Sequence, residues 1–248
     1  YLVGAGDAWA AIDPGPVDDS HLQALLAAAP GRISHVLTTH THRDHSPGAA
    51  ALAAATGAPV WGRVAAHPQG QDDSFVPQHQ PQHGERIHIA DGVTLRVIHT
   101  PGHASNHLCY LLEQEKLLFT GDHVMQGSTV VINPPDGDMA AYLSALTALL
   151  DEDLDWLAPG HGFLVDQPHG VLRALVAHRL KREDRVRAAL RRAGEAELAA
   201  LVPDAYADVQ PGLYPVARRS LLAHLLKLQH DGEAASADNG ERWRYLGN

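Results

Sequence analysis

The sequence predicts a mixed α/β (α+β) body of stacked layers, followed by a small domain of the winged-helix type. Two observations predict this division. Strand and helix patterns alternate through residues 1–168, whereas residues 169–230 are almost entirely helical in pattern. The charge changes at the same place, because residues 1–168 carry 6 basic and 19 acidic side chains and residues 169–230 carry 11 basic and 6 acidic ones. We therefore expect two domains, 1–168 and 169–248.

The composition is that of a globular chain. Of its 248 residues, 45% are hydrophobic and 19% are charged, with a net charge of −10. No apolar run approaches the ~20 residues of a spanning helix, so we expect no membrane partner. The single cysteine, Cys109, excludes an internal disulfide framework and, with no targeting segment visible, fits a cytoplasmic location. The 18 histidines nearly equal the 19 lysines and arginines, which directs attention to metal binding.

Turn and cap signals delimit the elements of the first domain. Strands are predicted at residues 9–13, 33–38, 60–61, 86–90, 94–99, 107–113, 116–119 and 154–157. Helices are predicted from the Asp18–Ser20 cap to residue 29, from Ser46-Pro47 to Gly57, and over residues 139–150. Between them, residues 69–84 are rich in Gln, His, Pro and Asp and predict a long mobile loop.

The second domain has a different pattern. A long helix with basic side chains on its polar face is predicted over residues 170–192, a short helix over residues 195–201 and a leucine-rich helix over residues 215–229. Residues 241–246, after Asp238-Asn239-Gly240, can form one arm of a hairpin. Three helices followed by a β wing form a winged-helix pattern.

The segment most informative about chemistry is TTHTHRDH, residues 38–45, which follows a predicted strand and precedes a predicted helix. His40 and His42 lie two residues apart, so on an extended strand end their side chains point to the same side. Asp44 and His45 follow where the helix begins and can reach a second position. Two imidazoles for one ion, and a carboxylate with an imidazole for its neighbour, suit Zn²⁺ or a similar metal.

Three later turns repeat one arrangement. Thr-Pro-Gly-His ends at His103, Thr-Gly-Asp ends at Asp122, and Pro-Gly-His-Gly contains His161. Each turn follows a predicted strand and places one metal-binding residue type beside a glycine, which lets the backbone approach closely. One Pro-Gly-His is weak support, but three such turns downstream of the histidine-rich loop form one pattern.

With these residues the sequence resembles the metallo-β-lactamase superfamily, and in particular its lactamase-β-like 2 subgroup. The resemblance covers residues 1–168 and implies an αββα sandwich, with the basic tail as a winged-helix-like domain. It implies that His40, His42 and His103 hold one metal ion and that Asp44, His45 and His161 hold a second. Asp122 would bridge the two ions, and Asp13 would orient the ligand loop.

The expected activity is that of a dinuclear zinc-dependent hydrolase, with Mn²⁺ or iron as alternatives to the two Zn²⁺ ions. A hydroxide bridging the metals would attack a carbonyl or phosphoryl centre. We expect Asp44, Asp122 and His107 to take part in catalysis, with His107 placed to donate to a substrate oxyanion. His123, next to Asp122, is a second histidine expected near the site.

The substrate and the oligomeric state stay open in the sequence. A single-stranded RNA endonuclease is suggested by the basic residues of 179–192, although Glu183 and Asp184 interrupt the run and aromatic residues are only 5%. The rival is a small (thio)ester hydrolase of glyoxalase-II type. Two non-enzymatic alternatives are a metal-sensing regulator that binds nucleic acid and a di-iron electron-transfer module. An open groove toward the basic tail would favour nucleic acid, and a closed pocket under residues 69–84 a small ester.

Overall fold

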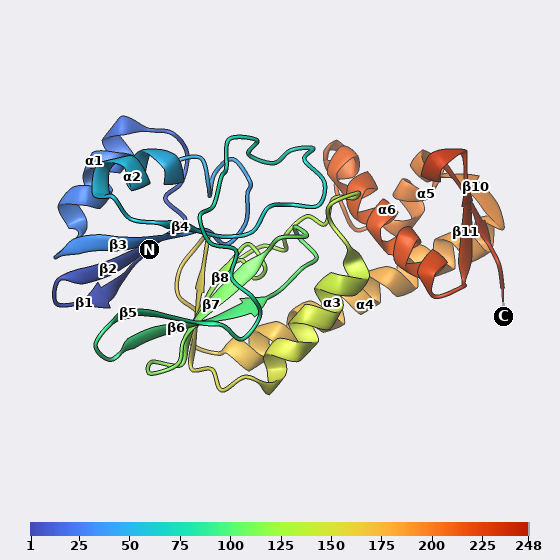
Figure 1. Ribbon diagram of the computed structural model, residues 1–248. Helices are drawn as coiled ribbons and strands as arrows, with labels where there is room; N and C mark the ends of the chain where they lie inside the picture. The colour runs from blue at the N-terminus through green and yellow to red at the C-terminus, as the bar shows by residue number, and fades with distance from the viewer. Residues whose placement is uncertain (248) are drawn as a thin grey trace.

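The computed structural model describes residues 1–247 and consists of a two-sheet sandwich with a small domain at one end (Figure 1). The first sheet consists of β1 (Leu2–Ala5), β2 (Ala8–Ile12), β3 (Arg32–Leu37) and β4 (Val60–Trp61). Strands β1 and β2 are antiparallel, whereas β2, β3 and β4 are parallel to one another. The second sheet consists of β5 (Arg86–Ala90), β6 (Val93–His99), β7 (Leu108–Leu112), β8 (Leu117–Gly121) and β9 (Trp156–Pro159). Strands β5 to β8 are antiparallel to their neighbours, and β9 is parallel to β8.

Three apolar layers hold the sandwich together. Between the sheets, Ile12 and Leu37 pack against Val97, Leu108 and Tyr110. The outer face of the first sheet is covered by α1 (Asp19–Ala28) and α2 (Ala49–Thr56), and that of the second by α3 (Met139–Ala148) and α4 (Pro168–Ala193). The four layers confirm the αββα fold that the resemblance implied, because each sheet buries one face against the other and one against helices.

The C-terminal domain has its own core. Its elements after α4 are β10 (Glu195–Glu197), α5 (Leu198–Ala205), α6 (Tyr214–His230), β11 (Ala234–Ala237) and β12 (Arg242–Tyr245), with short 3₁₀ turns at Pro211–Leu213 and Asp238–Gly240. A third 3₁₀ turn, Leu149–Asp151, follows α3 in the sandwich. The hairpin β11–β12 forms the wing, and β10 pairs with the other side of β12. Trp243 of β12 is fully buried among the helices. The winged-helix pattern is thereby confirmed.

Helix α4 belongs to both cores. Its first half packs Leu172 and Leu175 against the sandwich, whereas its second half packs Val186 and Leu190 in the C-terminal domain. This 26-residue helix therefore joins the two bodies as one continuous element. The domain boundary after residue 168 stays a prediction.

Two predictions about local structure need correction. Residues 195–197 form strand β10 rather than the start of a helix, because Ala196 pairs with the buried Trp243 across the ladder to β12. Residues 69–84 form an irregular loop that is anchored to the body, since the Asp72 amide donates to the Thr41 carbonyl at 2.7 Å and Phe75 is buried. These contacts argue against a freely moving lid. Within residues 1–247, no helix combines the length and apolar character that a membrane crossing requires.

Candidate metal centre

The metal-binding residue types predicted from the sequence lie in loops at strand ends. Strand β3 leads into the loop that carries His40, and β6, β8 and β9 lead to His103, Asp122 and His161. Strands β6, β8 and β9 run in the same direction, so their C-terminal ends lie at one edge of the second sheet. The structure brings all seven predicted ligands together at this edge, in three overlapping groups: His40, His42 and His103; His40, His45 and Asp122; Asp44, His45 and His161.

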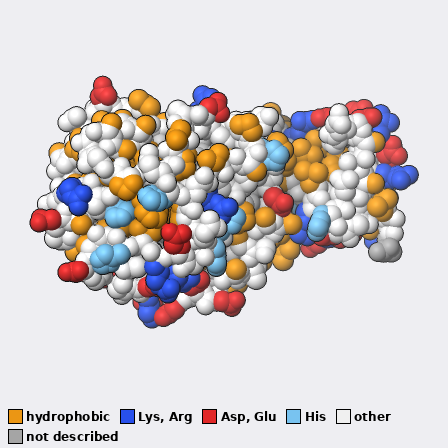
Figure 2. Space-filling model, viewed as in Figure 1, with side chains coloured by type: hydrophobic (Ala, Val, Ile, Leu, Met, Phe, Trp, Pro, Cys, Tyr) orange, Lys and Arg blue, Asp and Glu red, His pale blue; other side chains and the backbone are white. Residues whose placement is uncertain are grey.

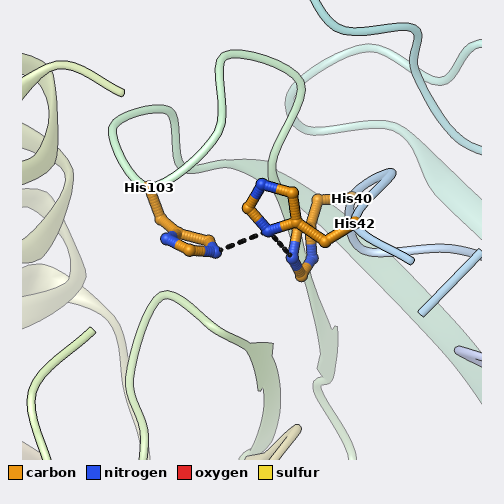
Figure 3. A group of neighbouring side chains, drawn as sticks. All are labelled: His40, His42 and His103. Carbon is orange, nitrogen blue, oxygen red and sulfur yellow. Dashed lines mark hydrogen bonds between the residues drawn. The ribbon is translucent and has the colours of Figure 1, made fainter. Parts of the chain in front are cut away.

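The first group consists of three imidazoles whose nitrogen atoms converge (Figure 3). Nδ1 of His42 lies 2.9 Å from Nε2 of His40 and 2.9 Å from Nε2 of His103. The Nδ1 atom of His103 faces the Val131 carbonyl at 2.9 Å, which leaves Nε2 directed at the centre. This arrangement matches the expected first ion position.

The second group is more open to solvent. Nε2 of His161 lies 3.1 Å from Oδ2 of Asp44, and Nε2 of His45 lies 3.6 Å from the same oxygen. The Asp44 and His161 side chains are 56% and 45% exposed, whereas that of His45 is 3% exposed. An ion held here would have one buried ligand and two at the surface, so this side of the centre is the one open to solvent.

Asp122 lies between the two groups. Its Oδ1 is 3.4 Å from Nε2 of His45 and 3.5 Å from Nε2 of His161, while its Oδ2 is 3.8 Å from Nε2 of His103. Oδ1 of Asp122 and Nε2 of His45 are both buried and have no hydrogen-bond partner among residues 1–247. Buried polar atoms are rarely left unpaired, and these two are ligand atoms that face each other. The donor set therefore fits two divalent ions with Asp122 between them.

Contacts behind the centre fix the orientation of the ligand rings. Oδ2 of Asp13 lies 2.8 Å from Nδ1 of His45, so the opposite nitrogen of His45 points toward Asp122. Asp13 also accepts hydrogen bonds from the Thr39 amide and hydroxyl, each at 2.7 Å. The Thr39 hydroxyl lies 3.0 Å from Nδ1 of His40. Such contacts hold metal ligands in one tautomer and one orientation.

Burial determines the protonation of most of these imidazoles. It lowers the pKa of His40 well below the usual value and that of His103 to about 4, so both rings are neutral at pH 7, the form that binds metal. Burial also acts to lower the pKa of His45, but the carboxylates of Asp13 and Asp122 outweigh it and raise that pKa to about 10 when no ion is bound. A metal ion at His45 therefore competes with a tightly held proton.

His107 and His123 lie beneath the ligands and are both fully buried. Nε2 of His107 accepts a hydrogen bond from the Asp122 amide at 3.2 Å, and its Nδ1 lies 2.9 Å from the Thr100 hydroxyl. With both ring nitrogens engaged inside the protein, His107 is not placed to donate to a substrate oxyanion as expected; it positions Asp122. Burial lowers the pKa of His123 to about 3, and in the described part of the chain neither of its ring nitrogens has a hydrogen-bond partner.

Gly160 allows the last strand to approach the centre. A Cβ at this position would lie 2.9 Å from Oδ1 of Asp122 and 2.9 Å from Cε1 of His45. Both contacts are shorter than real Cβ atoms show, so a side chain at this position would force the Asp122 carboxylate or the His45 ring to move. The Pro-Gly-His turn thus has a structural role besides carrying His161.

Sequence reasoning missed one residue that organises the rim of the site. Asp136 is 8% exposed and accepts hydrogen bonds from the Ser105 amide at 3.0 Å and hydroxyl at 2.6 Å, and from the Gln71 side chain at 3.0 Å. It therefore ties the loop 69–84 to the loop that follows His103. An aspartate in a Pro-Pro-Asp-Gly turn has no spacing that marks such a role.

Comparison with known proteins agrees with the fold. Residues 1–161 match the metallo-beta-lactamase superfamily, and residues 198–243 match the beta-lactamase associated winged helix domain. The chain belongs to the metallo-beta-lactamase superfamily. A metallo-beta-lactamase family protein from Thermus thermophilus superposes with a TM-score of 0.81 at 21% identity, over 99% of this chain and 92% of that one, which shows a shared fold.

Curated relatives extend the likeness to the whole chain. An atrochrysone carboxyl ACP thioesterase of Aspergillus chevalieri is 30% identical over 268 residues, covering 100% of this chain and 81% of the relative. The beta-lactamase-like protein 2 homolog of Drosophila melanogaster is 27% identical, covering 99% and 87%. The lactamase-like protein adaB of Aspergillus niger is 32% identical over 77% of this chain, and the chain spans 58% of its length. The superfamily and the predicted subgroup are confirmed.

Proposed function

We propose that this protein hydrolyses acyl thioesters and that its resident cofactor is a pair of Zn²⁺ ions. The observation that carries the metal part is the position of Asp122, with one oxygen toward each ligand group. The thioester part is supported by the similarity to an ACP thioesterase along the entire chain, winged helix included. In the reaction, water adds to the thioester carbonyl and the thiol leaves, which yields a carboxylic acid and a free thiol.

Some residues of the site would hold the ions, and others form the side of the site that is open to the substrate. Bound divalent ions would supply Lewis-acid polarisation of the carbonyl and activation of water. His40, His42 and His103 form the buried side of the centre, and Asp13 and His107 hold His45 and Asp122 in place. Asp44 and His161 form the exposed side, where the thioester approaches.

RNA cleavage, the main rival, receives less support because many of the basic side chains of the tail are already paired. Arg182 and Arg185 both contact Asp208, and Arg187 contacts Glu183, Asp184 and Glu233. Figure 2 shows acidic and basic side chains interspersed over the C-terminal domain. A phosphate backbone requires several free cations along one face, and pairing with carboxylates removes much of that attraction.

The test is a side-by-side assay of zinc-loaded protein on an acyl-coenzyme A thioester and on single-stranded RNA. We expect thioester hydrolysis that falls at least about 100-fold in Asp122→Asn, because the variant loses the bridging charge. Asp91→Asn, in an exposed turn between β5 and β6, is the matched control and should retain full activity. Cleavage of RNA with no thioester turnover would overturn the proposal.

A further inference from the structure

A cavity of about 260 Å³ lies where the C-terminal domain meets the sandwich. The segment 129–131 forms one wall, and α4, α6 and the α5–α6 connection form the others. Most of the lining is apolar, including Val130, Val209, Leu213 and Val216. Leu213 and Val216 are 55% and 41% exposed, and Figure 2 shows hydrophobic side chains on the visible surface over α6. An apolar cavity with an open rim suits the hydrocarbon part of a ligand.

One residue lies between the cavity and the metal centre. Val131 lines the cavity, and its carbonyl lies 2.9 Å from Nδ1 of the metal-ligand candidate His103. The winged-helix domain supplies most of the cavity wall.

Arg179 of α4 is the exceptional residue of this cavity. It is 4% exposed, donates to the Val130 carbonyl, and lies over the Tyr142 ring at 5.3 Å. Within residues 1–247 it takes part in no ion pair, and its buried Nε has no hydrogen-bond partner. Arg182, in the same wall, differs because Asp208 neutralises it at 2.8 Å.

A buried guanidinium without a carboxylate is unfavourable, because an arginine does not lose its proton and desolvation of its charge is costly. The contact with the Tyr142 ring offsets only part of that cost. A ligand carboxylate would satisfy the free donor and restore charge balance, and planar carboxylates match the guanidinium fork.

We propose that this cavity binds the acyl group of the substrate and that Arg179 recognises an acidic group at its far end. The inference rests on the proposed thioesterase function and adds a substrate class, thioesters of acids that carry a second carboxylate. The apolar wall holds the carbon chain, Arg179 binds the distal carboxylate, and the thioester end lies at the metal centre.

The experiment compares glutaryl-coenzyme A with pentanoyl-coenzyme A, which have equally long acyl chains and differ by one carboxylate. We expect zinc-loaded wild-type protein to prefer the glutaryl thioester by about 10- to 100-fold in kcat/KM, the range of a buried hydrogen bond to a charged group. Arg179→Met should reduce that ratio to about one. Arg191→Met, an exposed arginine on the same helix, is the matched control and should keep the ratio.

A second variant tests the cavity independently, in case Arg179→Met does not fold. Val216→Glu places a carboxylate at the exposed rim of the cavity, where it would repel the glutaryl group and compete for Arg179, so the ratio should again fall. A ratio near one in the wild type, or a ratio that survives both substitutions, overturns the assignment of the cavity. Failure to hydrolyse either thioester overturns the proposed thioesterase function itself.

Discussion

Asp13 and His45 are 32 residues apart in sequence, yet Oδ2 of Asp13 lies 2.8 Å from Nδ1 of His45. Asp13 sits directly after β2, the neighbour of β3 in the first sheet, and its backbone has a φ of 52°. This left-handed conformation is uncommon outside glycine, although aspartate tolerates it better than most residues. The contact determines which nitrogen of His45 faces the metal centre.

Replacing Asp13 with Asn should weaken metal binding without removing a ligand. The amide cannot accept from both Thr39 and His45 as a carboxylate does, so His45 loses its orientation. We expect zinc affinity to fall about 10- to 100-fold, the range seen when such supporting contacts are removed. Competition with a chelator of known zinc affinity measures the change. Asp7→Asn, in an exposed turn of the same sheet, should bind zinc as the wild type does.

Replacing Gly160 with Ala should disrupt the candidate metal centre by steric overlap alone, because no ligand is removed. The new Cβ would lie 2.9 Å from Oδ1 of Asp122, which forces the carboxylate or the loop to move. We expect activity to fall about 100-fold, the effect of a displacement of the order of 1 Å in an active site. The control is Gly170→Ala, whose Cβ would have its nearest neighbour at 3.8 Å in the exposed first turns of α4. Full activity in Gly160→Ala would contradict the close approach.

Arg182 is expected to support the fold rather than to bind a polyanion. It is 8% exposed, donates to the Ala205 carbonyl at 2.7 Å, and contributes most to holding the pKa of Asp208 well below its usual range. Arg182→Met should lower the free energy of unfolding by about 1 to 2 kcal/mol, since Asp208 is half exposed and keeps Arg185.

Urea unfolding of Arg182→Met beside Lys181→Met measures this difference. Lys181 is the exposed neighbour, so its variant should stay within about 0.5 kcal/mol of the wild type. Equal stability of the two variants would show that the Asp208 contact contributes nothing.

His224 should make stability depend on pH below neutrality. It is fully buried, and burial lowers its pKa, assisted by Arg179 and Arg182 and opposed by Glu183, whose Oε2 lies 3.7 Å from Nδ1. The unfolded chain takes up a proton near pH 6.5 that the folded chain refuses, so the free energy of unfolding falls as pH drops below that value.

His224→Leu should therefore flatten the pH dependence of stability between pH 6.5 and pH 5. His230→Leu, an exposed histidine on the same helix, should leave the wild-type slope in place. Unfolding curves of the zinc-loaded proteins at several pH values give the slopes. The same slope in His224→Leu and in the wild type would contradict the assignment.

Spacing in the sequence was sufficient to predict which seven residues lie together at the candidate metal centre, but not what surrounds them. His40, His42 and His45 are close in the chain, so the alternation of side chains along an extended segment predicts that they lie near one another. His103, Asp122 and His161 each follow a strand, and the ends of these strands lie at one edge of the second sheet. The role of His107 was predicted wrongly because only the fold shows that the Asp122 amide occupies its ring nitrogen.

The tail shows the other limit of sequence reasoning. Both Arg179 and Arg182 contributed to the helix with a basic face that the sequence predicted. The structure buries both side chains, and of these two only Arg182 pairs with a carboxylate among residues 1–247. That difference arises from Asp208, which lies beyond α5 and approaches α4 only after the C-terminal helices pack. Helical periodicity predicts which basic residues share one face of a helix, but not which carboxylates neutralise their charge.

The central claim is that two ions, held on either side of Asp122, make this chain a thioesterase. Its most direct test is a titration of metal-free protein with Zn²⁺, in which the rate of acyl-thioester hydrolysis is followed at each addition. We predict a rate that reaches its plateau at two equivalents of zinc per chain. A plateau at one equivalent, or no hydrolysis at any zinc concentration, would contradict the account.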